Sequence, residues 1–175
     1  KARKDVWLRS IFNTLGPLTN PAAANRQLVG VFAPELTEMF ARALQRLGTK
    51  RALVVHGHDG LDEISVCAPT RICELRDGQI VTYDLYPEQY FGRTAGAEEI
   101  AGGDPAQNAE ITKDILSGVK GARRDIVLIN TAAALMAAGR AEGIEQGIAM
   151  AERAIDTGAA VDKLNSLIEF TRENA

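Results

Sequence analysis

Cysteine and histidine are both scarce in this sequence of 175 residues. The two cysteines, Cys67 and Cys73, fit neither a paired metal-ligand spacing nor the cysteine-rich pattern of small secreted proteins. We therefore expect reduced thiols and a cytoplasmic location. The two histidines, His56 and His58, have no cysteine or further histidine spaced to complete a zinc site. The sequence therefore gives no indication of zinc chemistry.

Several motifs of covalent and phosphate chemistry are absent as well. The sequence contains no Gly-x-Ser-x-Gly motif, no P-loop and no paired catalytic cysteine and histidine. It also lacks any apolar run of about 18 residues, the length that a membrane-spanning helix needs. These absences argue against acyl transfer through a protein nucleophile, against nucleotide hydrolysis and against a membrane partner.

Charge of neither sign dominates, because 23 acidic residues oppose 20 basic ones and the net charge is −3. A chain without a basic stripe has no electrostatic preference for nucleic acid, so we predict no nucleic-acid partner. Hydrophobic residues make up 46% and charged residues 25%, which is typical of globular proteins. Because no linker or internal repeat divides the sequence, we predict that residues 1–175 form a single domain.

The first part of the sequence has the pattern of an α/β fold. Residues 27–32 and 51–57 are predicted buried strands, and a predicted helix joins them. That helix begins at Pro34, where a missing N–H costs nothing, and ends before Gly48. The strand–helix–strand order predicts a parallel crossover, with helices packed against the faces of the sheet.

The next part predicts antiparallel strands. Residues 64–69, 70–76 and 79–85 are short runs rich in β-branched residues, and Asp77 followed by Gly78 is a hairpin-turn signal. We therefore expect a mixed, mainly parallel sheet with flanking helices and a few antiparallel strands.

After an irregular segment, residues 87–104, the sequence is predicted to be helical to its end. Asp104 is a predicted N-cap, with Pro105 in the first helical position. Residues 122–138 are apolar on nearly every side, so this helix should be buried centrally. The four expected helices cover residues 105–117, 122–138, 143–157 and 160–172.

Two segments are candidate binding sites. Arg9 stands beside a loop, residues 10–21, and an arginine there could bind a carboxylate through two hydrogen bonds, although an ordinary surface arginine is an open alternative. Asp59, Asp62 and Glu63 directly follow an apolar strand. Ligands of parallel α/β sheets bind beyond the carboxyl ends of the strands, and Mg²⁺ is often held by one or two carboxylates and substrate phosphates. The alternative is a solvated acidic turn.

Two other features are interpreted structurally. Gly102 and Gly103 precede a helix and could cradle an anion, but Asp104 already places negative charge at the positive end of that helix, so capping is the better interpretation. Asn130 lies mid-helix among apolar residues, and a buried asparagine needs hydrogen-bond partners, which are most often backbone groups or water.

Three stretches resemble the anthranilate phosphoribosyltransferase family. Residues 9–21 (Arg-Ser-Ile-Phe-Asn-Thr-Leu-Gly-Pro-Leu-Thr-Asn-Pro) are similar to its signature run. Residues 57–63 (Gly-His-Asp-Gly-Leu-Asp-Glu) resemble its acidic metal-binding loop, and residues 108–129 its C-terminal helices. The resemblance covers essentially the whole chain and implies a nucleoside phosphorylase/phosphoribosyltransferase-like fold.

The resemblance implies transfer of a phosphoribosyl group from phosphoribosyl pyrophosphate to the amine of anthranilate, a step of tryptophan biosynthesis that depends on Mg²⁺. Arg9 matches the arginine that binds the carboxylate of anthranilate. Asp62 and Glu63 match the acidic pair that binds Mg²⁺ on the pyrophosphate side. The resemblance implies no protein nucleophile, and it implies a homodimer for the full-length enzyme.

Some parts of the family pattern have no counterpart here. The glycine-rich pyrophosphate loop (Gly-Thr-Gly-Gly-Asp), the Lys-His-Gly-Asn segment and the small N-terminal helical part are absent from the sequence. We therefore expect residues 1–175 to be the C-terminal portion of the α/β domain, with little or no transferase activity alone.

Three alternatives compete with this hypothesis. A pyrimidine nucleoside phosphorylase would share the fold, but residues 9–21 look like the anthranilate enzyme throughout. A nucleic-acid-binding relative would be expected to lose the acidic pair, whereas Asp62 and Glu63 are both present. A purely structural domain without a working site is the third alternative.

Overall fold

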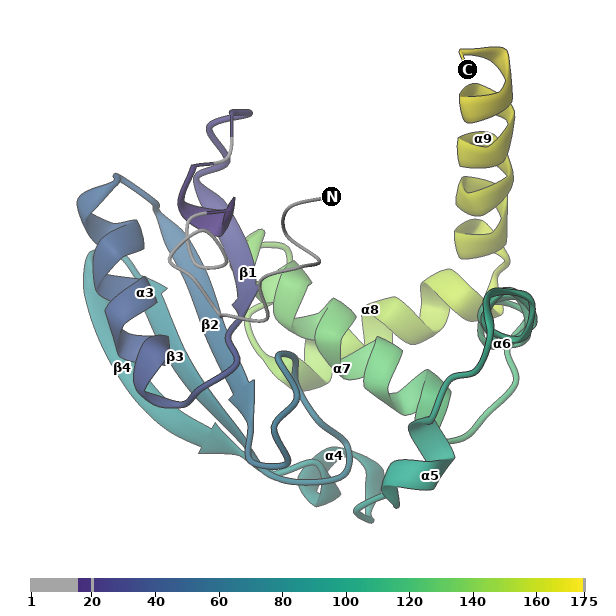
Figure 1. Ribbon diagram of the computed structural model, residues 1–175, viewed down its shortest axis with the longest axis horizontal. Coiled ribbons are helices and arrows are strands. Elements are labelled where there is room, and N and C mark those ends of the chain that lie inside the picture. Colours follow the sequence, from purple (N-terminus) through teal and green to yellow (C-terminus); the bar gives the residue numbers. More distant parts are fainter. Residues whose placement is uncertain (1–15, 20, 175) are drawn as a thin grey trace, which may run out of the picture.

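The computed structural model describes residues 16–19 and 21–174, in which a four-stranded sheet carries helices on both faces (Figure 1). The strands lie side by side in chain order: β1 (Arg26–Gly30), β2 (Arg51–Gly57), β3 (Thr70–Arg76) and β4 (Gln79–Leu85). A 3-10 turn, η1 (Gly16–Leu18), precedes β1. The predicted α/β class and mixed sheet are confirmed.

The prediction of a mainly parallel sheet is wrong for the described strands. β1 and β2 pair in parallel, whereas β2 with β3 and β3 with β4 pair antiparallel. The reason is that α3 (Glu35–Arg46) is the one helix that carries the chain back between neighbouring strands of this sheet. The β2–β3 connection is a loop, and the β3–β4 connection is the predicted tight turn at Asp77 and Gly78.

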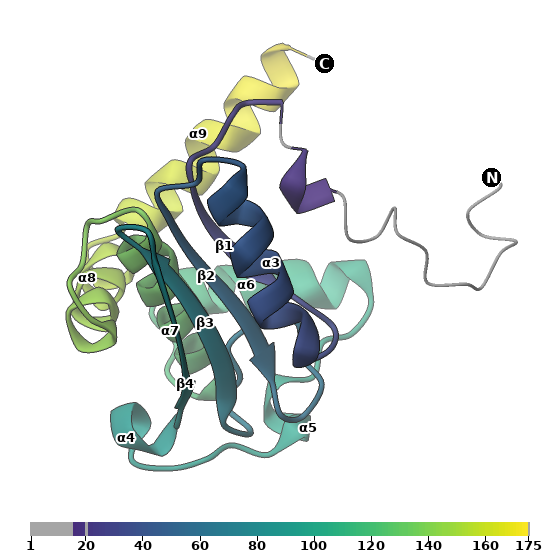
Figure 2. The same ribbon diagram turned by 90° about the vertical axis from the view of Figure 1, so that its left-hand side faces the viewer.

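The two faces of the sheet bury separate hydrophobic clusters. On one face α3 packs through Phe40, Ala41 and Leu44 against β1, β2 and β3. On the other face lie α7 (Ala122–Ala137) and α8 (Ile144–Asp156). Figure 2 shows the sheet between α3 and the α7–α8 pair. Burial of both faces explains why residues 52–57 of β2 are all buried.

The central helix α7 is buried along much of its length, as the apolar sequence predicted. Its neighbour α8 approaches closely at Gly147, where a Cβ would lie 2.6 Å from the Cα of Ala132. At the far end of α7, Arg26 donates to the carbonyl of Ala138 (2.6 Å) and Arg51 donates to that of Met136 (3.3 Å). These arginines place positive charge at the carboxyl end of the helix, where the helix dipole favours it.

The remaining helices surround the lower and outer parts of the molecule. Two short helices, α4 (Glu88–Phe91) and α5 (Ala97–Ile100), lie in the segment expected to be irregular, and α6 (Pro105–Leu116) follows them. The last helix, α9 (Ala159–Glu173), projects from the body of the molecule (Figure 1). None of the helices within residues 16–19 and 21–174 is long and apolar enough to cross a membrane.

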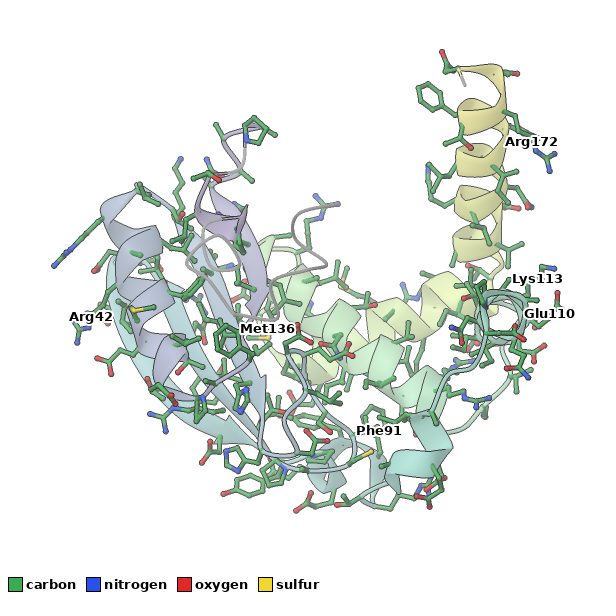
Figure 3. All side chains as sticks on the ribbon, in the orientation of Figure 1. Arg42, Phe91, Glu110, Lys113, Met136 and Arg172 are labelled. Atoms are coloured by element: carbon green, nitrogen blue, oxygen red, sulfur yellow. The ribbon has the colours of Figure 1, made fainter. Side chains whose placement is uncertain are left out.

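Surface ion pairs lie on the outer sides of the helices. Figure 3 shows Arg42 on the side of α3 that faces away from the sheet, where it pairs with Glu38. Lys113 pairs with Glu110 on α6 in the same way, at 2.7 Å. Phe91 of α4, labelled in Figure 3, packs against the cluster between the sheet and α7 and also against a third cluster. This third cluster joins α6, α7 and α8 through Ile115, Leu128, Ala151 and Ile155. Exposed ion pairs contribute little to stability, so apolar packing of this kind is what positions the helices.

Candidate functional site

A loop of residues 58–69 joins the end of β2 to the start of β3 and carries the acidic residues. Its base is closed by backbone hydrogen bonds from His58 N to Pro69 O (2.9 Å) and from Gly57 N to Leu61 O (2.8 Å). In Figure 1 the loop lies at the lower end of β2, on the side of the sheet that faces α7. We call residues 58–69 the acidic loop.

Asp59 stabilises the acidic loop from within. Its Oδ2 accepts a hydrogen bond from Ser65 Oγ at 2.6 Å, and Ser65 Oγ in turn accepts one from the backbone N–H of Cys67 at 2.9 Å. The backbone N–H of Ser65 donates a hydrogen bond to Thr70 Oγ1 at 2.9 Å. Asp59 is therefore engaged in the structure of the loop, which separates it from the two other carboxylates.

The prediction of a strand at residues 64–69 is wrong, and side-chain hydrogen bonds within the acidic loop explain why. The side chains of Ser65 and Thr70 bind backbone N–H groups that a sheet would otherwise use, so this run is bent and irregular instead. Its apolar members, Ile64 and Val66, are nevertheless buried in the cluster under α7. The β-branched composition reflected burial of these side chains and not strand pairing.

Asn130 of α7 binds the acidic loop directly. Its Oδ1 accepts a hydrogen bond from Ile64 N at 2.9 Å, and its Nδ2 donates to Ile64 O at 2.8 Å and to Ile126 O at 2.9 Å. The expectation that this asparagine would find backbone partners is confirmed. Its particular partner was not foreseeable, since the two residues are 66 positions apart and nothing in the sequence pairs them.

The end of β1 supports the acidic loop from the opposite direction. A Cβ placed on Gly30 would overlap the backbone carbonyl of Asp62, so only glycine allows the loop to cross here. Beyond β1, the carbonyl of Val31 lies 2.8 Å from Nδ1 of the buried His56. His56 therefore has the structural role expected for it, and exposed His58 lies 3.3 Å from Asp84.

Asp62 and Glu63 both expose their side chains on the surface of this loop. Within residues 16–19 and 21–174, neither carboxylate makes a hydrogen bond or an ion pair. Partial burial, then the charges of Asp62 and Asp59, raise the pKa of Glu63 above its ordinary value. A bound cation would relieve this repulsion.

The donor set suits a magnesium ion that is shared with a substrate. The described residues contain no group of three or more acidic, histidine or cysteine ligands that could hold a metal by themselves. Mg²⁺ characteristically takes one or two carboxylates and completes its shell with waters and phosphate oxygens. Asp62 and Glu63, adjacent carboxylates beyond the carboxyl end of β2 that pair with no other described residue, fit that arrangement.

The other candidates from the sequence lie elsewhere. Arg9 is outside the described residues. Asp104 caps α6 as predicted, because its Oδ1 accepts from Gln107 N at 2.9 Å while Gln107 Oε1 accepts from Asp104 N at 3.0 Å. Gly102 and Gly103 line an open hollow of about 840 Å³ along α6, whose lining does not include the acidic loop.

Comparison with known proteins places this chain in a family. The sequence matches the model of the glycosyl transferase family, a/b domain, over residues 1–161. The chain belongs to this family. It is similar to the anthranilate phosphoribosyltransferase of Syntrophobacter fumaroxidans, with 61% identity over 174 residues, which are 99% of this chain and 52% of that relative. The chain therefore spans about half the length of the curated relatives that it matches.

Solved structures agree with this family membership. The chain is similar to the crystal structure of anthranilate phosphoribosyltransferase from Thermus thermophilus, with a TM-score of 0.87, 38% identity and coverage of 97% of this chain and 50% of that one. It is also similar to the Saccharomyces cerevisiae enzyme in complex with PRPP and Mg, with a TM-score of 0.84, 28% identity and coverage of 95% and 48%. The mixed sheet and its flanking helices are thus the fold of these enzymes.

Proposed function

We propose that this chain is the C-terminal portion of the α/β domain of an anthranilate phosphoribosyltransferase, and that it supplies the acceptor side and the metal side of the active site. The observation that carries the proposal is the exposed pair Asp62 and Glu63 beyond the carboxyl end of β2, which no other described residue binds, in a chain 61% identical to an enzyme of that name. The reaction moves a phosphoribosyl group from phosphoribosyl pyrophosphate to the amine of anthranilate.

Asp62 and Glu63 hold Mg²⁺ in this proposal. The bound cation supplies charge neutralisation for the departing pyrophosphate. The role of the chain is to present two carboxylates on a loop whose backbone is fixed by Gly30 and Asn130. The yeast relative was solved with PRPP and Mg, which supports this assignment.

Arg9 binds the carboxylate of anthranilate in the same proposal. A guanidinium forms two parallel hydrogen bonds with a carboxylate, so it can orient the ring as well as hold it. Orientation matters here because the amine must be aligned with the anomeric carbon, and alignment alone can supply a large part of the rate enhancement. No protein nucleophile takes part.

The half of the relatives that this chain does not cover supplies the remaining contacts to the pyrophosphate, and the full-length protein is a homodimer in this proposal. Support for these points comes from the resemblance of residues 9–21 and 57–63 to the family motifs. We propose a cytoplasmic location because tryptophan biosynthesis uses soluble metabolites.

The decisive experiment uses a fusion protein in which this chain replaces the matching part of the Syntrophobacter fumaroxidans relative. We expect the fusion to convert anthranilate in the presence of phosphoribosyl pyrophosphate and Mg²⁺, and the 175-residue chain alone to show little or no turnover. Asp62→Asn and Glu63→Gln should each lower the rate at limiting Mg²⁺ by roughly tenfold to a thousandfold, since each removes a proposed ligand.

Glu169→Gln is the matched control, because Glu169 is an exposed carboxylate on α9, remote from the acidic loop in sequence. It should leave both the rate and its Mg²⁺ dependence unchanged. If the two acidic-loop variants behave like this control in an active fusion, the metal assignment is wrong. If the unmutated fusion folds but does not consume anthranilate, the assignment of the substrate is wrong.

A further inference from the structure

The amide of Asn130 forms a two-point clamp on a single residue of the acidic loop. It accepts from Ile64 N and donates to Ile64 O, at 2.9 Å and 2.8 Å. The second amide hydrogen goes to Ile126 O, one turn earlier in α7. Both donors of the asparagine and one acceptor site are therefore satisfied, which fixes the rotation of the side chain.

An asparagine is not needed at this place for helix packing. Its neighbours Leu128, Ile129, Ala132 and Ala133 are all buried and apolar, and leucine has nearly the shape of asparagine. Asparagine also disfavours a helix interior slightly. The contribution that only the amide makes is the pair of hydrogen bonds to a backbone 66 positions away.

The clamped N–H belongs to the peptide group that joins Glu63 to Ile64. Because a peptide group is planar, fixing its N–H also fixes the plane that contains the Cα of Glu63. The side chain of Ile64, with no exposed surface, anchors the same residue in the apolar cluster. The orientation from which the Glu63 side chain leaves the backbone is thus set by α7.

The other carboxylate is constrained from the opposite side. The carbonyl of Asp62 lies against Gly30 at the end of β1, in contact too close for any side chain at that position. Asp62 and Glu63 are consequently held between a strand on one side and a helix on the other. Thr70 accepts a hydrogen bond from the N–H of Ser65, two residues beyond Glu63. This contact does not fix the peptide group between Glu63 and Ile64, so it cannot substitute for Asn130.

We propose that Asn130 is a positioning residue for the metal site: through the backbone of Ile64 it holds the Asp62–Glu63 pair in the geometry that binds the divalent cation. This inference rests on the proposed function for its metal but not for its geometry. A mutated outer partner of a metal ligand typically lowers affinity or activity by about 10-fold to 100-fold.

The first test needs no variant. Hydrogen exchange is measured by NMR on the unmutated 175-residue chain, and the amide of Ile64 should be protected to the same order of magnitude as the amides of β2, although it lies in a loop. Exchange as fast as that of the exposed residues 62 and 63 would mean that the clamp does not persist in solution, and the inference would be wrong.

The second test compares Asn130→Leu and Asn130→Ala, which both remove the amide but respectively fill and vacate its space. The control is Thr37→Val, which removes a hydrogen bond (2.7 Å, to Pro34 O) from a fully buried side chain of α3. In the fusion protein, both Asn130 variants should raise the Mg²⁺ concentration for half-maximal activity by about 10-fold to 100-fold. The rate at saturating Mg²⁺ should change much less, and Thr37→Val should change neither.

The outcomes separate the two proposals. If Asp62→Asn and Glu63→Gln raise the Mg²⁺ requirement but both Asn130 variants leave it unchanged, the positioning role is wrong while the metal site stands. If the acidic-loop variants have no effect either, the proposed function fails, and the exchange rate of Ile64 still decides whether the clamp exists. A loss of rate at all Mg²⁺ concentrations, with the requirement unchanged, would reduce Asn130 to a structural residue.

Discussion

The backbone carbonyl of Asp62 occupies the space that a side chain on Gly30 would need. Gly30→Ala should therefore displace the acidic loop or the end of β1, because the obstructing atom is backbone and cannot rotate away. We expect a loss of about 1–3 kcal/mol in the free energy of unfolding, the usual cost of overpacking, measured by urea denaturation. The exchange of the Ile64 amide should accelerate as well.

Gly16→Ala is the control for this substitution. No described residue lies within 4 Å of a Cβ at Gly16, and its backbone does not have the left-handed conformation that favours glycine. Its stability should be unchanged or slightly higher, since alanine restricts the unfolded chain. Equal stabilities of the two variants would show that Gly30 does not touch the loop in solution.

A second close approach lies between α7 and α8. A Cβ at Gly147 would lie 2.6 Å from both Cα and Cβ of Ala132, so Gly147→Ala should force the two helices apart. Alanine normally stabilises a helix interior by about 1 kcal/mol relative to glycine. We nevertheless expect Gly147→Ala to lower the free energy of unfolding by about 1–3 kcal/mol, which is opposite in sign to the effect of helix propensity. A higher free energy of unfolding would contradict the close packing of α7 and α8.

Arg124 is a buried cation with few partners. Its side chain is 4% exposed, and it binds Asp156 Oδ1 at 2.7 Å and Gly118 O at 3.0 Å. Asp156→Asn should lower the free energy of unfolding by about 1–3 kcal/mol, because it leaves a buried charge without its counter-ion.

The control for this pair is Asp77→Asn. Asp77 is 85% exposed and lies 3.6 Å from Arg76, so its removal should cost at most about 1 kcal/mol. Urea denaturation of both variants in low and high salt provides the comparison. If the two losses are equal, burial of Arg124 does not strengthen its ion pair.

The pH dependence of stability should reflect Glu99. Two hydrogen bonds from Arg93 (3.1 and 2.7 Å) and one from Gly96 N (2.9 Å) lower the pKa of this carboxyl. A lowered pKa means that the folded state holds the proton less tightly than the unfolded state, so this contribution is present above the unfolded pKa and is lost as the pH falls. Glu99→Gln should therefore lower Tm at pH 7 and have a smaller effect near pH 3. An equal offset at both pH values would contradict this.

Arg9→Lys tests the acceptor side of the proposed site. Lysine keeps the charge but cannot form two parallel hydrogen bonds with a carboxylate. In the fusion protein we expect the KM for anthranilate to rise by about tenfold, with the KM for phosphoribosyl pyrophosphate nearly unchanged. An equal rise of both constants would remove Arg9 from the anthranilate site.

The sequence predicted the local features of this fold well. Asp104 and Gln107 predicted a capping box, and the Asp77–Gly78 pair predicted a hairpin turn; both are present. Each depends on side chains only a few positions apart, so the pattern is visible in the sequence itself. The helices α6 to α9 begin and end within one or two residues of the predicted bounds for the same reason.

Long-range relationships were not predictable in this way. Nothing in the neighbourhood of Asn130 indicates Ile64, and nothing near Gly30 indicates Asp62, because these contacts arise when distant segments cross. Asp59 is one of three acidic residues that the sequence grouped together, but its carboxylate accepts a hydrogen bond from Ser65. Only the folded loop distinguishes a carboxylate that holds the backbone from two that are available to a ligand.

The arginine at the start of β1 has a consequence for the order of events during synthesis. Arg26 is bonded to the carbonyl of Ala138, 112 positions later. At about 5–20 residues per second, the ribosome adds that partner roughly 6 to 22 s after Arg26 itself. During this interval α3 can already cover one face of β1, but the face that packs against α7 has no helix over it. The α7 face of β1 is therefore the part of this strand that stays uncovered longest during synthesis.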